Sequence, residues 1–288
     1  MEKNIEVNGV RLTYFERGTS FGGTKPTLLF LHATGFHARV WDKIINNFSE
    51  HHVIAVDQRG HGRSEKKKIE NWTELITDIS ELIKHLDLLN ITGIGHSMGA
   101  HALIGACGGL EDRFNNLIAI DPVIPEESAY QEATSEQVES IEQHPIANRR
   151  NEFDSPEAMA KRLADKGSYS IFDPEMFMDY CRYGLLPKEG GKGYVLACPP
   201  EIEASVYMAS RSNADIYAAV RKIEIPVLII RAKEIKKDRD LMDFSASPTW
   251  PGLANEFKNG HEIHFPDNTH FLPMELPDEI SRIIQSQL

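Results

Sequence analysis

The stretch Gly95-His96-Ser97-Met98-Gly99 decides the fold of this 288-residue chain. It fits Gly-x-Ser-x-Gly and lies between an apolar segment that ends at Gly95 and an alanine-rich segment that runs to Cys107. A strand, a sharp turn and a helix in this order would hold a serine hydroxyl above a sheet, at a helix N-terminus. Glycines suit the flanking positions because side chains there would collide with neighbouring backbone. Ser97 is therefore the candidate nucleophile.

The same glycines also imitate a dinucleotide-binding fingerprint. Gly93, Gly95 and Gly99 approach G-x-G-x-x-G, but the third glycine comes one residue late and the turn sits in the middle of the chain. An oxidoreductase would use a nicotinamide cofactor, whereas the hydrolase interpretation needs none. The spacing disfavours the oxidoreductase.

Outward from Ser97, apolar runs alternate with helical patterns. Such runs are typical of strands buried on both faces of a parallel sheet. The strongest helical pattern has apolar residues at helical spacing, with Asn71 and Glu74 placed as a capping box. The alternation predicts parallel βαβ units in a doubly wound α/β sheet. The predicted strands are 27–31, 52–56, 116–120, 225–230 and 261–265, and the predicted helices are 71–88, one near 251–257 and one from Pro277.

The chain divides into a core and an insertion. Asn8-Gly9 is a turn signal between segments 5–10 and 11–17, so an opening hairpin is expected. From about residue 123 the alternation stops, and polar helical patterns follow, such as the helix start at Ser155-Pro156-Glu157. We predict an α/β core at 1–123 and 216–288, with residues 124–215 inserted as a cap.

The amino-acid composition limits the kinds of molecule that this protein is expected to bind. A hydrophobic fraction of 41% and a charged fraction of 26% are ordinary for a globular protein. The net charge of −12 disfavours nucleic acid and anionic lipid, whose phosphates would be repelled. No signal-peptide pattern or membrane-spanning run is evident, so we expect a soluble cytoplasmic protein without membrane contact. The three cysteines lack CxxC spacing, and reduced thiols are expected.

Several segments together resemble the α/β-hydrolase superfamily over nearly the whole chain outside the cap. Besides the serine pentapeptide, they are Leu31-His32-Ala33-Thr34-Gly35, the loop from Asp57 to Ser64, and the segment from Asn268 to Glu275. The resemblance implies an α/β-hydrolase fold, with a mostly parallel eight-stranded sheet and a helical cap. It also implies that the backbone N–H groups of Thr34 and Met98 bind an oxyanion. Ala33 stands where the family usually has glycine.

The same resemblance places the general base at His270, after the last predicted strand. The imidazole needs a carboxylate, but the usual position after the seventh strand reads Ala232-Lys233-Glu234-Ile235, with isoleucine in place of aspartate. Asp121 directly follows strand 116–120 and preserves the order Ser, Asp, His, so it is the candidate acid. The alternatives are Glu234, Asp238, Asp240 and Asp243.

These residues predict a serine hydrolase that cleaves a small carboxylic ester through an acyl-enzyme. Thioesters, lactones and amides are open alternatives, and the missing usual acid motivates a ligand-sensing protein with little turnover. The acyl-enzyme route requires no cofactor. No metal is expected, because His261-Glu262-Ile263-His264 has the wrong spacing for a zinc motif. Ser247-Pro248-Thr249-Trp250 resembles a segment in a subgroup of these hydrolases.

Overall fold

The computed structural model describes residues 1–132, 140–234 and 245–288. Its main feature is an eight-stranded sheet in the order β1-β2-β4-β3-β5-β6-β10-β11. The pairs β1/β2 and β2/β4 are antiparallel, and the remaining neighbours are parallel. The predicted mostly parallel eight-stranded sheet is therefore confirmed. Its strands are β1 (Glu2–Val7), β2 (Val10–Arg17), β3 (Thr27–Leu31), β4 (Val53–Asp57), β5 (Ile91–His96), β6 (Phe114–Ile120), β10 (Val227–Arg231) and β11 (Gly260–His264).

The expected opening hairpin is present. Val7 of β1 pairs with Val10 of β2 across the two-residue turn Asn8-Gly9. Both turn residues have positive φ, 47° and 67°, which is the conformation that twists correctly between antiparallel strands. The turn thus fixes the register of the hairpin.

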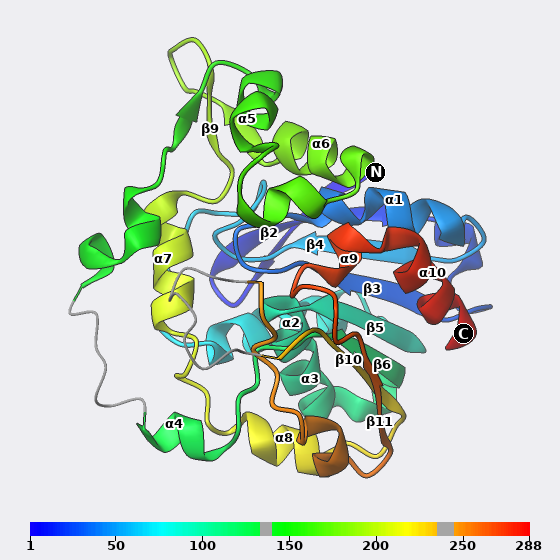
Figure 1. Ribbon diagram of the computed structural model, residues 1–288. Coiled ribbons are helices and arrows are strands. Elements are labelled where there is room, and N and C mark those ends of the chain that lie inside the picture. Colours follow the sequence, from blue (N-terminus) through cyan, green and yellow to red (C-terminus); the bar gives the residue numbers. More distant parts are fainter. Residues whose placement is uncertain (133–139, 235–244) are drawn as a thin grey trace.

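The central strands are buried on both faces, as their unbroken apolar runs predicted. Along β3, Leu28 and Phe30 pack on the side of α1 and α10, whereas Leu29 and Leu31 pack on the side of α2, α3 and α8. Full burial of such a side chain contributes about 1.5–3 kcal/mol. Figure 1 shows these two helical layers on opposite sides of the sheet. The layer helices are α1 (Asp42–Ile45), α2 (Thr73–His85), α3 (Met98–Leu110), α8 (Ile216–Lys222), α9 (Leu272–Glu275) and α10 (Pro277–Ser286).

The start of α2 carries the predicted reciprocal cap. The backbone N–H of Thr73 donates to Asn71 Oδ1 at 2.8 Å, and the N–H of Asn71 donates to Glu74 Oε2 at 3.3 Å. These bonds satisfy N–H groups that a helix N-terminus leaves without intrahelical partners.

Between β6 and α8 the chain leaves the sheet, and most of this part builds a layer above one end of it, whereas α4 lies beside α8 (Figure 1). The helix start at Ser155 is confirmed, because its Oγ accepts the N–H of Ala158 at 3.2 Å. The small three-stranded sheet β7-β9-β8 was not predicted, because its strands have only two or three residues. The elements are α4 (Ser128–Glu132), η5 (Ile141–Gln143), η6 (Pro145–Asn148), β7 (Glu152–Phe153), α5 (Pro156–Leu163), η7 (Gly167–Ile171), α6 (Pro174–Tyr183), β8 (Leu185–Pro187), β9 (Tyr194–Leu196) and α7 (Pro200–Met208).

The helix expected near 251–257 is only a 3-10 turn, η8 (Leu253–Glu256). Phe257 is already extended, with ψ 145°, because the chain must enter β11 at Gly260. The other 3-10 turns are η1 (Thr19–Phe21), η2 (Ala38–Trp41), η3 (Asn46–Phe48) and η4 (Glu111–Arg113).

Among the described residues, no helix combines the length and apolar character needed to cross a membrane. Cys107, Cys181 and Cys198 are buried and free of disulfides, as expected.

Candidate active site

Ser97 occupies the turn between β5, which ends at His96, and α3, which begins at Met98. Its φ of 58° lies in a region that residues other than glycine rarely adopt. The flanking glycines make this turn possible. A Cβ on Gly95 would lie 2.5 Å from the Ala100 Cα, and one on Gly99 would lie 2.6 Å from the Leu31 carbonyl oxygen. The backbone is therefore strained at Ser97, the candidate nucleophile.

His270 reaches Ser97 from the segment between β11 and α9. Its Nε2 lies 2.9 Å from the Ser97 Oγ, within hydrogen-bond distance. Two backbone contacts hold this histidine: its N–H donates to the Ser245 carbonyl at 2.8 Å, and its own carbonyl accepts from His96 Nε2 at 2.8 Å. Imidazole in this position can take the serine proton.

Asp121 follows β6 directly and completes the chain of contacts. Its Oδ2 accepts from His270 Nδ1 at 2.6 Å, which fixes the ring with Nε2 toward Ser97. The carboxylate is fully buried, and its other oxygen accepts from the Ala232 backbone N–H at 3.1 Å and from the Ser247 hydroxyl at 2.5 Å. Burying a carboxylate is costly unless such partners form hydrogen bonds with it. The structure thus brings together Ser97, His270 and Asp121.

Glu234 does not approach His270. Its side chain is 64% exposed and pairs with Arg231, whose guanidinium also contacts Glu262. The other alternative acids, Asp238, Asp240 and Asp243, lie outside the described residues. Among the described carboxylates, only Asp121 contacts the imidazole of His270.

The segment Ser247-Pro248-Thr249-Trp250 holds the candidate acid, a role that sequence reasoning missed. Besides the Ser247 bond, the Thr249 hydroxyl lies 3.2 Å from Asp121 Oδ1 and 2.7 Å from the Pro122 carbonyl. The only signal in the sequence was a pair of hydroxyl residues two positions apart. Nothing local relates them to an aspartate more than 120 positions earlier.

Thr34 and Met98 present backbone N–H groups near the serine. Thr34 lines the same cavity as Ser97 and His270, and Met98 is the first residue of α3. Among the described residues, neither N–H donates to another group. The Met98 N–H also lies at a helix N-terminus, which favours negative charge. The two N–H groups are therefore suited to an oxyanion.

Comparison with known proteins shows the family of this chain. A sequence model of the alpha/beta hydrolase family matches residues 28–283. The chain belongs to this family. An (E)-2-((N-methylformamido)methylene)succinate hydrolase of Acinetobacter baylyi is 28% identical, and the match covers 100% of this chain and 98% of that protein. A 2-(acetamidomethylene)succinate hydrolase of Mesorhizobium japonicum is 26% identical over 82% of this chain and 79% of its own.

The fold of this alpha/beta hydrolase is shared with solved structures. The crystal structure of E-2-(acetamidomethylene)succinate hydrolase has a TM-score of 0.77 at 22% identity, and the match covers 99% of this chain and 98% of that one. Several relatives of this chain are esterases. The relatives named here are thus hydrolases and esterases.

In this alpha/beta hydrolase, the loop from Asp57 to Ser64 supports the Thr34 segment. The Gln58 backbone N–H donates to His32 Nε2 at 3.0 Å, and the Gln58 side-chain amide donates to the His32 carbonyl at 2.7 Å. His32 Nδ1 donates to the Ala33 carbonyl at 2.8 Å, and burial holds the pKa of His32 well below its ordinary value. A neutral His32 therefore fixes the backbone that leads to Thr34.

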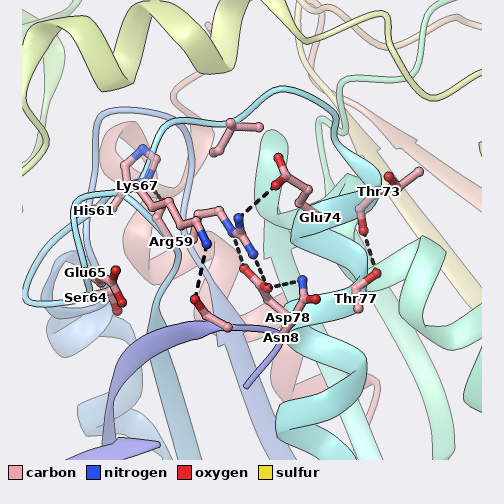
Figure 2. A network of polar contacts seen from close by, with 12 residues as sticks. Asn8, Arg59, His61, Ser64, Glu65, Lys67, Thr73, Glu74, Thr77 and Asp78 are labelled. Atoms are coloured by element: carbon pink, nitrogen blue, oxygen red, sulfur yellow. Dashed lines mark hydrogen bonds and ion pairs between the residues drawn. The ribbon is translucent and has the colours of Figure 1, made fainter. Parts of the chain in front are cut away.

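The same loop is tied to α2 by a buried ion pair. Arg59 donates from Nε and Nη2 to the two carboxylate oxygens of Asp78, both at 2.7 Å, and from Nη1 to Glu74 at 2.9 Å. Arg59 and Asp78 are each 1% exposed. Figure 2 shows this network, in which Asn8 from the opening hairpin also contacts Asp78. Bidentate pairing gives the loop a fixed orientation.

Ser97 and His270 open into a cavity of about 150 Å³. A larger cavity of about 490 Å³ adjoins it, since both are lined by Thr34, Tyr207 and Phe271. Most other lining residues of the larger cavity come from the inserted segment, which sequence reasoning did not resolve into inward and outward side chains. They include Ile146, Arg149, Tyr169, Phe172, Tyr180 and Glu203.

Within the described parts of the chain, no group of three or more His, Cys, Asp or Glu side chains could hold a metal ion.

Proposed function

We propose that this protein is a serine hydrolase that cleaves a small carboxylic ester through an acyl-enzyme. One observation carries the proposal: the continuous contact from Asp121 through His270 to Ser97. Ser97 Oγ attacks the substrate carbonyl while His270 Nε2 accepts the serine proton. Asp121 stabilises the imidazolium that forms. The N–H groups of Thr34 and Met98 bind the oxyanion as its charge develops.

The tetrahedral intermediate then expels the alcohol, which receives the proton held by His270. Water attacks the resulting acyl-Ser97, again with His270 as the general base, and the carboxylic acid leaves. Every proton moves between Ser97, His270, water and the leaving group, so no cofactor is required by this route. The inserted segment above the serine forms the walls that select the substrate.

A second candidate substrate is the amide-type bond of an N-acylaminomethylene dicarboxylate. The observation that favours it is the 28% identity to the Acinetobacter baylyi hydrolase over the full length of both chains. The proposed residues could cleave an amide by the same acyl-enzyme route, with His270 protonating the departing nitrogen. Lactones and thioesters would require the same steps.

The sequence has no aspartate at the family's usual acid position after the seventh strand. This favours an alternative function, a ligand sensor with little turnover. The contact between Asp121 and His270 favours the hydrolase instead. Steady-state turnover still separates the two functions, because a sensor would show no more than one cycle per Ser97.

The test is hydrolysis of p-nitrophenyl acetate and of 2-(acetamidomethylene)succinate by the purified wild type and the Ser97→Ala variant. The proposal predicts many cycles of p-nitrophenol release per wild-type molecule and none above background for Ser97→Ala. Faster turnover of the acetamido compound would select the second candidate. Equal activity in the two proteins would reject the serine mechanism.

A further inference from the structure

The wall of the larger cavity carries a cation, Arg149. This residue takes no part in the proposed chemistry. It follows η6, and its side chain is 23% exposed. Around it the wall is largely aromatic, with Phe36, Tyr169, Phe172 and Tyr180. A guanidinium on such a wall is partly shielded from water, which strengthens its attraction for an anion.

Glu203 of α7 holds this guanidinium in place. Arg149 Nη1 lies 2.5 Å from Glu203 Oε2, and the Glu203 side chain is only 4% exposed. Among the described residues, Glu203 is the one ion-pair partner of Arg149, and no hydrogen bond of Nε or Nη2 is formed there. A planar fork with one nitrogen held by a buried carboxylate is suited to a second carboxylate from a ligand.

The charge around the cavity favours an anion. The charged residues on its wall are Arg149, Lys166 and Glu203, two cations and one anion, beside the tyrosines Tyr169, Tyr180 and Tyr207. Arg149 and Lys166 also line a neighbouring hollow, together with Arg150 and Arg162 and without any acidic residue. The whole chain carries a net charge of −12, so the positive charge around this hollow contrasts with the rest of the molecule. Such a local field raises the encounter rate of anionic ligands.

The larger cavity and the serine cavity share Thr34, Tyr207 and Phe271. A ligand can therefore occupy both, with its reactive carbonyl at Ser97 and a charged group beside Arg149. We propose that Arg149 is a carboxylate-binding residue, and that the substrates are small esters or amides that carry a free carboxylate. This inference rests on the proposed function, because it places the scissile bond at Ser97.

The probe is succinate, with succinamide as its neutral counterpart, and the readout is binding by titration calorimetry. Wild type is expected to bind succinate at least about tenfold more tightly than succinamide, the usual advantage of a charge-assisted contact. Succinate should also raise KM for p-nitrophenyl acetate without lowering kcat, which locates it at the serine cavity. Equal affinity for the two probes, or a fall in kcat alone, would overturn the inference.

Arg149→Met alone leaves Glu203 buried without its partner, so the decisive variant is Arg149→Met with Glu203→Gln, checked for folding by its thermal transition. The preference for succinate over succinamide should then disappear, whereas Arg113→Met, at an ion pair with the exposed Asp87, should keep it. A double variant that keeps the wild-type preference contradicts the role of Arg149. Wild-type turnover of p-nitrophenyl acetate tests the proposed function separately, because the calorimetric result does not depend on catalysis.

Discussion

The Ser247 hydroxyl donates a 2.5 Å hydrogen bond to Asp121 Oδ1, although the two residues are 126 positions apart. Asp121 lies at the end of β6, and Ser247 lies in the segment between β10 and η8. The bond leaves Oδ2 directed at His270, 2.6 Å from Nδ1. An acid after β6 is thus held in place by the part of the chain that follows β10, where the family's usual acid would stand.

Asp121→Asn should lower kcat for p-nitrophenyl acetate by about ten-thousandfold, because an amide cannot hold the imidazole in the required tautomer. Steady-state kinetics measures the effect. The matched variant is Glu234→Gln, at the exposed partner of Arg231, which should keep kcat within about twofold of wild type. The reverse ranking of these two variants would remove Asp121 from the mechanism.

Ser247→Ala should lower both kcat and the free energy of unfolding. The substitution removes one donor from a buried carboxylate, which costs about 1–3 kcal/mol. The Ala232 N–H and the Thr249 hydroxyl remain near the same oxygen, so the loss of kcat should be smaller than for Asp121→Asn. Denaturant unfolding and kinetics together test this. Unchanged stability and unchanged kcat would show that the Ser247 contact does not position the acid.

Gly99→Ala should disrupt the active site. Its Cβ would lie 2.6 Å from the Leu31 carbonyl oxygen and 2.7 Å from that of His32, so the loop that leads to Thr34 must move. Activity should fall by at least about tenfold, since shifts of about 1 Å misplace reacting groups. Gly109→Ala is the control, because the new Cβ meets nothing within 4 Å. In that helix it should stabilise the protein by about 0.5–1 kcal/mol. Similar kinetics for both variants would refute the steric argument.

Arg59→Met should destabilise the fold by about 3–5 kcal/mol, because it leaves Asp78 buried without its cation. The change in Tm and the denaturant midpoint measure the loss. Arg113→Met breaks an ion pair whose Asp87 side chain is 79% exposed, and it should cost about 0–1 kcal/mol. If both substitutions cost the same, the ion pair between Arg59 and Asp78 contributes no more than a surface contact.

The three cysteines should resist thiol reagents in the folded protein. Burial raises the pKa of Cys181 to about 12, and it also raises the pKa of Cys107 and of Cys198. The thiolate is the reactive form, so a raised pKa leaves little of it at pH 8. Ellman's reagent should therefore label no thiol before unfolding and three per chain in denaturant. Rapid labelling of the native protein would contradict their burial.

Most of the core could be predicted because its determinants are local. Two glycines and the apolar runs beside them indicate the strand, turn and helix around Ser97. Buried strands such as β3 and β4 have unbroken apolar sequences because helices cover both faces. The strands β7, β8 and β9 were missed because two or three residues show no period.

The environment of the site could not be predicted in the same way. Asp121 was one of several possible acids, since its contact with His270 joins residues 149 positions apart. Arg149 and Glu203 resemble ordinary surface charges until α7 brings them together at the cavity. Hydroxyl donors such as Ser247 carry no periodic signal at all. Such long-range pairings depend on the fold and leave no trace in local sequence.

The role of Ser97 as nucleophile is tested most directly by active-site titration with a fluorophosphonate, followed by peptide mass spectrometry. We expect one phosphonyl group per chain, attached to Ser97, and loss of ester turnover in proportion to labelling. Labelling at another residue, or turnover that persists in fully labelled protein, would contradict the claim that Ser97 is the nucleophile.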